Sequence, residues 1–312
     1  MSFFLHRCLR NLCEGKYHGY FSSDALTCRM LYPRFRKKEE YLLKMSNPKE
    51  INLSSVPSET QIKYRRLTEF FLAHPKVAIA FSGGVDSAFL LYAAIQSDIE
   101  VKAYYVKSAF QPEFELEDSL RLAAELNASI DILNVDVLSS EIITSNPSDR
   151  CYYCKNKIFG TITEAASKDG FTLLLDGTNA SDEEGDRPGM RALRELSVLS
   201  PLREYGLTKD EIRLLSKEAG LFTWNKAAYA CLATRIPTGE TITEEKLKAT
   251  EEAEDYLFSL GFTNFRVRRF RDCARIQIQE SQINLLLEHR EQILKELKKH
   301  YKGVMLDLEV RK

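Results

Sequence analysis

A glycine turn between a buried strand and an apolar helix is the feature that most constrains how this 312-residue chain folds. Residues 77–94 read VAIAFSGGVDSAFLLYAA, where apolar runs flank two glycines, an aspartate and two serines. Gly83 and Gly84 permit positive φ and a close approach of the backbone to a ligand. The backbone N–H groups that open the following helix, aided by the helix dipole, bind a phosphate anion. The turn therefore predicts a phosphate site at the carboxyl edge of a sheet.

The pattern around this turn alternates between strand and helix from about residue 60 onward. Apolar runs predict strands at 76–81, 101–106, 129–138 and 171–177, and helical periodicity predicts helices at 61–74, 87–98, 114–127 and 155–170. Strands separated by single helices imply right-handed crossovers and a parallel sheet covered on both faces. We therefore expect an α/β fold with a doubly wound parallel sheet.

The pattern changes near residue 236, where helix, strand, strand, helix and strand follow in order. This order predicts a smaller, antiparallel α+β domain at 237–312, after a larger α/β domain at 46–236. Residues 1–45 have no clear periodicity and hold three of the seven cysteines. We expect a flexible extension there, or a start codon assigned too far upstream, with a targeting or partner-binding segment as the alternative.

Composition limits the classes of function. With 44% hydrophobic and 29% charged residues and a net charge of −1, the chain is typical of a soluble globular protein. The charge gives no support for nucleic acid or membrane as a partner. No secretory signal opens the chain, so we expect a cytoplasmic protein. In a reducing compartment, clustered cysteines usually indicate metal or redox chemistry.

Asp86 distinguishes the glycine turn from an ordinary capped helix start. A carboxylate beside phosphates is expected mainly where a divalent cation lies between them. Ser82 and Ser87 add hydroxyl donors to the same turn. The spacing matches neither the Walker A motif nor the dinucleotide-binding GxGxxG motif.

The stretch SGGVDS resembles the PP-loop of ATP pyrophosphatases, which cleave ATP between the α- and β-phosphates and adenylylate a substrate. The resemblance implies that ATP is bound with Mg²⁺, and that Asp86 contacts the metal through the phosphates. It implies that adenine lies near the end of the second strand. The implied ATP-binding residues are Ser82, Gly83, Gly84, Val85, Asp86, Ser87, Val106, Ser108 and Gly177.

Four further segments narrow the resemblance to one family. NPSDRCYYCKNKIF, DGTNASDEEGDRPGMRAL, SPLREYGLTKDEIR and YACLATRIPTGETIT are similar to the LarE family, and the similarity runs from about residue 60 to the C-terminus. Those proteins are sulfur transferases that build the nickel-pincer nucleotide of lactate racemase. The resemblance implies adenylylation of a carboxylate of pyridinium-3,5-biscarboxylic acid mononucleotide and its conversion to a thiocarboxylate. It also implies a homo-oligomer, with a hexamer as one arrangement.

The sulfur donor depends on Cys151, Cys154 and Cys231. Structural zinc takes four ligands, and a [4Fe–4S] cluster is normally held by four thiolates. Three thiolates leave one iron open to hydrosulfide, which is how family members with this three-cysteine pattern are believed to work. Sacrificial use of Cys231 as a catalytic sulfur source, zinc, a redox disulfide and inert thiols remain alternatives. We expect Cys273 to be a buried residue at a strand edge.

An acidic turn and several arginines complete the predicted site. The resemblance favours Asp182 and Glu183 near the substrate, although these carboxylates also fit a solvated loop. Guanidinium groups match phosphate oxygens, so substrate phosphate is expected at Arg187 and Arg235 and, by resemblance, at Arg266 and Arg268.

Two other functions compete with this interpretation. A tRNA thiolation enzyme of the same superfamily would also use a PP-loop and cysteine sulfur, but such proteins usually carry a basic RNA-binding surface. A nucleotide-binding sensor on the same scaffold would have no need of Asp86 and three thiols.

Overall fold

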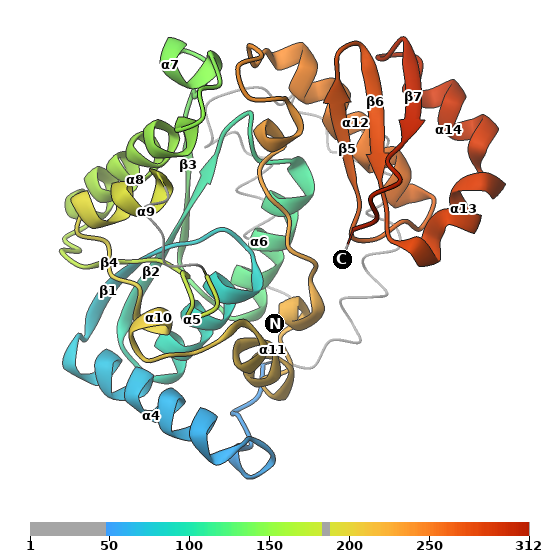
Figure 1. The fold of residues 1–312 in the computed structure, drawn as a ribbon. Helices are drawn as coiled ribbons and strands as arrows, with labels where there is room; N and C mark the ends of the chain where they lie inside the picture. Colours follow the sequence, from blue (N-terminus) through green and yellow to red (C-terminus); the bar gives the residue numbers. More distant parts are fainter. Residues whose placement is uncertain (1–47, 183–187, 312) are drawn as a thin grey trace, which may run out of the picture. The chain divides into compact units, whose positions relative to one another are not determined.

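Four parallel strands form the central sheet in the order β3-β2-β1-β4 (Figure 1). The computed structural model describes residues 48–182 and 188–311, so the extension expected at 1–45 and the predicted site residues Glu183 and Arg187 lie outside the described residues. The strands are β1 (Lys76–Ala80), β2 (Glu100–Lys107), β3 (Ile130–Asn134) and β4 (Leu174–Leu175). In the parallel register, Val77 pairs with Val101 and Ile79 with Leu175.

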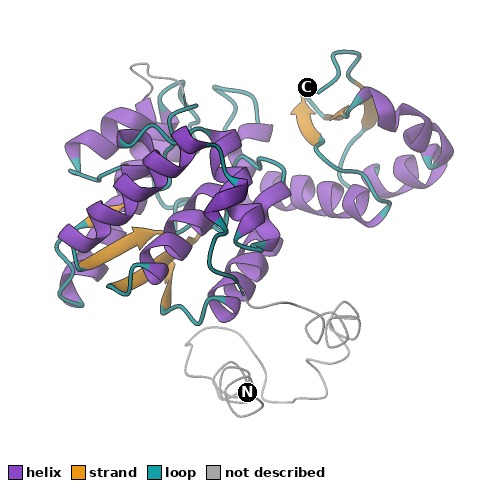
Figure 2. Ribbon diagram, turned by 90° about the horizontal axis from the view of Figure 1, so that it is seen from below, coloured by secondary structure: helices purple, strands orange, loops and turns teal. Residues whose placement is uncertain are grey.

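Helices cover both faces of this sheet, as Figure 2 shows. They are α4 (Ser58–Ala73), α5 (Val85–Gln96), α6 (Glu113–Glu125), α7 (Glu141–Thr144), α8 (Arg150–Lys168), α9 (Pro188–Glu195), α10 (Pro201–Glu204) and α11 (Lys209–Glu218), with 3₁₀ turns η1 (Leu53–Ser55), η2 (Phe222–Asn225) and η3 (Leu232–Arg235). Because strand side chains alternate between faces, Val77 and Ile79 join one buried core and Ala78 joins another. The two cores confirm the predicted doubly wound α/β sheet.

Helix α8 begins at Arg150, five residues before the predicted start at 155. No glycine or proline lies between 150 and 155 to delay it, and Asp149 stands at the N-cap. Cys151 and Cys154 therefore lie on the helix, three residues apart, where side chains share one face. Strand β4 is also much shorter than predicted, and Leu199 extends its edge through an isolated parallel bridge to Leu175.

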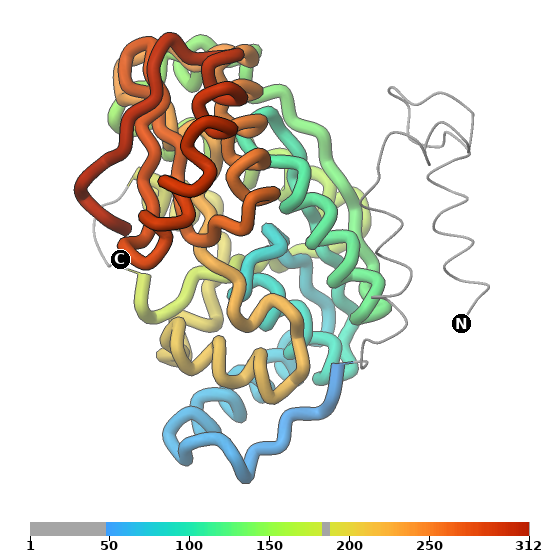
Figure 3. Tube along the Cα trace, turned by 90° about the vertical axis from the view of Figure 1, so that its right-hand side faces the viewer, coloured from blue at the N-terminus to red at the C-terminus, as the bar shows by residue number. Residues whose placement is uncertain are grey.

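A second, three-stranded sheet lies at the C-terminal end of the chain (orange to red in Figure 3). Its elements are α12 (Glu244–Ser259), β5 (Arg266–Phe270), β6 (Cys273–Gln277), η4 (Glu280–Gln282), α13 (Ile283–Glu288), α14 (Arg290–Leu297) and β7 (Gly303–Leu306). Leu257, Phe265, Ile276 and Leu297 form part of its core.

The prediction of an antiparallel sheet is wrong for one of the two strand pairs. Strands β5 and β6 are antiparallel, but β6 and β7 are parallel. The connection through α13 and α14 returns the chain to the end of the sheet where β6 began, and a helical crossover of this kind joins parallel strands. The domain is α+β, as predicted, with a mixed sheet. No helix among the described residues is long and apolar enough to span a membrane.

Candidate active site

A cavity of about 370 Å³ opens at the carboxyl ends of β1 and β2. Ser82, Gly84 and Asp86 line it from the glycine turn, Val106 from the end of β2, and Cys231 from the segment before η3. The structure therefore brings the predicted phosphate turn, the predicted adenine position and one predicted sulfur residue to a single cavity.

The glycine turn leaves its amide groups available. Gly84 is the N-cap of α5 and no side chain caps this end of the helix, so the first N–H groups have no side-chain acceptor. Gly83 has a φ of +69°, and a Cβ there would lie 2.2 Å from Ser119 Oγ. The hydroxyls of Ser82 and Ser87 are 3.1 Å apart. The turn is a narrow backbone cradle suited to an anion.

The predicted adenine and strand-edge positions lie at the ends of β2 and β4. A Cβ on Gly177, just after β4, would lie 2.8 Å from the Ser87 amide nitrogen, so only glycine fits where β4 meets α5. Val106 lines the cavity. Ser108 is buried and its hydroxyl donates to Gln111 Oε1 at 2.6 Å, which fixes the turn after β2.

Asp86 is held by two groups that the sequence analysis did not single out. Lys209 Nζ lies 2.5 Å from Asp86 Oδ2, and Asn179 Nδ2 donates to Oδ1 at 3.3 Å. Burial raises the pKa of Asp86, Lys209 opposes the rise, and Asp182 adds to it. Asp182 Oδ2 also accepts a hydrogen bond from the backbone N–H of Asn179 at 2.9 Å, so the acidic turn adjoins the cradle. The capping box at Thr208 was the available signal for Lys209, because it fixes this lysine at the first position of α11.

Lys226 is a second cation that the sequence analysis missed. Its Nζ lies 2.8 Å from Asp118 Oδ2 and donates to Gly83 O at 3.3 Å, and its side chain lines the cavity. Nothing in the local sequence separates it from a solvated surface lysine. With Lys209, it supplies positive charge on the side of the cradle where phosphates would lie.

The three predicted cysteine ligands interact electrostatically. Burial, with smaller contributions from the neighbouring Cys231 and Cys151, raises the pKa of Cys154 to about 12. Burial also raises the pKa of Cys231, against the pull of Arg150. Within the described ranges, no three His, Cys, Asp or Glu side chains converge to hold a metal ion. Cys273 lies elsewhere, at the start of β6.

The charge and contacts of Arg150 indicate whether these thiols fit an iron–sulfur cluster. Its buried guanidinium donates to Asn146 Oδ1 at 2.5 Å and to Ala233 O at 3.0 Å, and its Nη2 lies 4.0 Å from Cys151 Sγ. In the described part of the chain it has no carboxylate partner. An uncompensated buried cation is costly unless an anion lies nearby. Three thiolates beside Arg150 fit an anionic cluster, in which each thiolate binds its own iron and the sulfurs need not converge on one point.

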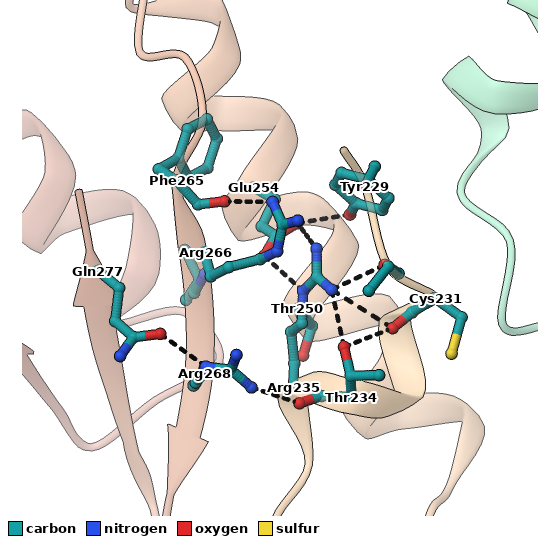
Figure 4. Close-up of polar contacts among 12 residues, drawn as sticks. Tyr229, Cys231, Thr234, Arg235, Thr250, Glu254, Phe265, Arg266, Arg268 and Gln277 are labelled. Carbon is teal, nitrogen blue, oxygen red and sulfur yellow. Dashed lines mark hydrogen bonds and ion pairs between the residues drawn. The ribbon is translucent and has the colours of Figure 1, made fainter. Parts of the chain in front are cut away.

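Three of the predicted arginines, Arg235, Arg266 and Arg268, lie in one region with Glu254 (Figure 4). Arg235 is fully buried and pairs with Glu254 at 2.9 Å. Arg266 donates to Phe265 O and Ala228 O. Arg268 donates to Gln277 Oε1 and Thr234 O. Among the described residues, Glu254 is the one carboxylate that contacts these three guanidinium groups, so positive charge exceeds negative charge here.

The three arginines differ in how far their N–H groups are already hydrogen-bonded within the protein. Burial, followed by the charge of Arg235, lowers the pKa of Arg266 to about 10, the direction expected where cations crowd. Arg235 also donates to Ala230 O at 2.7 Å and to Thr234 Oγ1 at 2.8 Å, so its donors are used within the protein. In Figure 4 the Cys231 sulfur points away from this group. Arg235 holds the Cys231 segment in place, and Arg266 and Arg268 are better placed to take an anion.

The parallel sheet, the open glycine cradle and the adjoining carboxylate define the nucleotide-binding domain of a PP-loop ATP pyrophosphatase. A pyridinium-3,5-bisthiocarboxylic acid mononucleotide synthase of Lactiplantibacillus plantarum is 34% identical over 236 residues, which are 75% of this chain and 86% of that protein. The chain belongs to the family of that synthase, LarE.

Two further relatives match the chain. An uncharacterized protein of Synechocystis is 35% identical over 72% of this chain and 85% of its own length. A tRNA-specific 2-thiouridylase MnmA of Thermotoga is 28% identical over 48% of this chain and 54% of its own length. No family model matches the chain.

Proposed function

We propose that this protein is an ATP-dependent sulfurtransferase that adenylylates a carboxylate of pyridinium-3,5-biscarboxylic acid mononucleotide and converts it to a thiocarboxylate. The product serves biosynthesis of the nickel-pincer nucleotide of lactate racemase. The observation that carries the proposal is that the glycine cradle and Cys231 line one cavity. An acid activated at the cradle would then form close to a sulfur-bearing residue.

The cradle residues account for the first half-reaction. The amides of Gly83, Gly84 and Val85 and the hydroxyls of Ser82 and Ser87 bind the pyrophosphate of ATP. Asp86 would contact the Mg²⁺ that accompanies ATP. Mg²⁺ would compete with Lys209 for the Asp86 carboxylate, which frees the Lys209 ammonium for a phosphate oxygen. Val106, Ser108 and Gly177 enclose the nucleoside side.

The cysteines account for the second half-reaction. Cys151, Cys154 and Cys231 would hold a [4Fe–4S] cluster, which would supply sulfur as hydrosulfide, and Arg150 would compensate its negative charge. The alternative is that Cys231 gives up its own sulfur. The two routes differ in turnover, because a sacrificed cysteine limits each chain to one sulfur atom.

The arginines and the acidic turn account for binding of the acceptor nucleotide. Arg266 and Arg268 carry charge that the protein does not neutralise, which suits the nucleotide phosphate. Arg235 supports the Cys231 segment beside them. Asp182 extends the site from the cradle, and we propose substrate-binding roles for Glu183 and Arg187, which lie outside the described residues. We further propose that the protein works in the cytoplasm as a homo-oligomer, with a hexamer as one arrangement.

Acceptor-dependent exchange tests this function. Exchange of labelled pyrophosphate into ATP is expected only with the pyridinium dicarboxylate mononucleotide present, and sulfide is then expected to convert the adenylate to a thiocarboxylate seen by mass spectrometry. Absence of AMP and pyrophosphate with this acceptor overturns the proposal.

A tRNA thiolation activity is the second candidate, because the MnmA relative matches the same domain. Unmodified tRNA offered in place of the mononucleotide is expected to give no exchange and no thiolated base. Steeply salt-dependent tRNA binding with thiolation would favour this candidate instead.

A further inference from the structure

Glu115 is an acidic side chain of the cavity to which the proposed function assigns no role. It lies in the first turn of α6 and lines the cavity together with Ser82, Asp86 and Cys231. Its own carbonyl oxygen accepts from Ser119 Oγ at 2.7 Å, and Ser119 packs beneath Gly83. The helix that carries Glu115 is therefore fixed directly against the phosphate cradle.

The nearby cations already have partners. Lys226 pairs with Asp118 and Arg235 with Glu254. Lys107, at the end of β2, pairs with Glu113 at 2.9 Å. These groups and Asp118 are the charges that influence Glu115 from α6, β2, the segment before η3 and η3 itself. Among the described residues the Glu115 carboxylate has no hydrogen bond or ion pair of its own.

Tyr105 adds a second polar group without a partner. Its side chain is only 1% exposed, its hydroxyl has no hydrogen-bond partner within 48–182 and 188–311, and it lines the same cavity. After burial, Glu115 is the largest electrostatic influence on this hydroxyl. Buried polar groups are normally satisfied, so the unsatisfied Tyr105 hydroxyl beside Glu115 in a cavity indicates that a bound reactant completes this group.

We propose that Glu115 is the proton acceptor of the sulfur-transfer step, with the Tyr105 hydroxyl positioned to hydrogen-bond the carboxyl group or the reacting oxygen. This inference rests on the proposed function. Hydrosulfide attacks the carbonyl carbon of the acyl adenylate, a carbon–sulfur bond forms, and the carbon–oxygen bond to AMP breaks. The proton of the S–H group passes to the Glu115 carboxylate, and thiocarboxylate and AMP leave as anions.

The ionisation of Glu115 suits this role. Burial raises its pKa to about 7, against the pull of Lys226. A base is most effective when its pKa lies near the working pH, because it is then both available and sufficiently basic. Asp86, which adjoins the cradle and pairs with Lys209, is committed to the phosphate side of the cavity.

The test uses the full chain with Glu115→Gln and, as a matched control, Glu113→Gln from the same helical turn. Two steps are measured separately: pyrophosphate exchange with the mononucleotide, and single-turnover thiocarboxylate formation with sodium sulfide. We expect Glu115→Gln to keep exchange within about 3-fold of the wild type and to slow sulfur transfer by about 100-fold. Glu113→Gln is expected to leave both steps unchanged.

The pH profile supplies a readout that a structural role would not move. The rate of the wild-type protein is expected to rise as pH passes about 7 and Glu115 loses its proton, and Glu115→Gln loses that limb. Ionisation of sulfide itself affects both proteins equally. Equal losses of exchange and sulfur transfer, or no loss of either, overturn the role of Glu115. Absence of exchange in the wild type overturns the proposed function, and this inference with it.

Discussion

Arg235 and Glu254 form a buried bidentate ion pair that connects the segment of Cys231 to the C-terminal domain. Arg235 Nε lies 2.9 Å from Glu254 Oε1, and Nη2 lies 3.0 Å from Oε2. Glu254 also accepts from the Val267 amide of β5 at 2.9 Å and from the Tyr229 hydroxyl. One carboxylate thus connects α12, β5 and the residues on either side of Cys231.

Removing one member of this pair is expected to destabilise the protein strongly. Arg235→Met leaves Glu254 buried without its ion-pair partner, which costs about 3–5 kcal/mol of unfolding free energy. Replacing both, as Arg235→Met with Glu254→Leu, is expected to cost less than either single change. Urea unfolding followed by circular dichroism measures all three variants.

The matched control is the exposed pair of Lys168 and Glu164 on α8, whose side chains are 72% and 69% exposed. Lys168→Met is expected to leave the urea midpoint unchanged, because solvent screens such pairs. A loss for Arg235→Met no larger than that of the control would contradict the role of the buried pair.

The contact between Lys209 and Asp86 predicts how ATP is used. Asp86→Asn removes the carboxylate of the proposed Mg²⁺ contact. Lys209→Met removes a positive charge proposed to contact a phosphate oxygen of ATP. Each variant is expected to lower pyrophosphate exchange by about 100-fold or more. Lys248→Met is the control, because Lys248 is exposed and pairs with the exposed Glu252 at 3.9 Å. Exchange within about 3-fold of the wild type in Asp86→Asn would remove Asp86 from the site.

The cysteines predict a defined metal content. After anaerobic reconstitution the wild type is expected to hold about four irons and four sulfides per chain. Cys151→Ser, Cys154→Ser and Cys231→Ser are each expected to lose most of the iron and the broad absorbance of the cluster. Cys273→Ser is the control and is expected to keep both. Full iron content in Cys154→Ser would exclude the three-cysteine site.

Much of this organisation could be predicted from the sequence because local patterns carry it. The alternation of apolar runs gave the parallel sheet, and SGGVDS gave the cradle. Partners far apart in the chain carry no such signal. Lys209 lies 123 positions from Asp86, and Glu254 lies 19 from Arg235. Burial decides roles too: Arg235 matches a phosphate-binding pattern, but its donors are occupied within the protein.

The close approach of Gly177 to α5 predicts that a larger residue at this position disturbs the cradle. Gly177→Ala places a methyl group 2.8 Å from the Ser87 amide and must displace the start of α5, so we expect at least a 10-fold rise in KM for ATP. Gly160→Ala is the opposite case, since Gly160 lies within α8 and a Cβ there meets nothing within 4 Å. It is expected to stabilise the protein by about 0.5–1 kcal/mol without changing KM. Thermal unfolding and initial-rate kinetics measure both, and an unchanged KM in Gly177→Ala would contradict the packing argument.

The raised pKa of Glu115 predicts that its presence costs stability at alkaline pH. Its pKa is about 7 in the folded protein and 4.5 in the unfolded chain, so the folded state binds more protons between these values. Stability is then lost as pH rises through this window, and the full cost applies above about pH 7.

Glu115→Gln removes this ionisation and is expected to be more stable than the wild type at pH 8, by about 1–3 kcal/mol. The gap should shrink at pH 5.5, where Glu115 is mostly protonated in the folded protein. Urea midpoints at the two pH values measure the gap, and Glu113→Gln should show no such dependence because Glu113 is exposed. A gap of equal size at both pH values would mean that Glu115 is charged throughout, and the variant that slows sulfur transfer would then owe its effect to something other than a lost base.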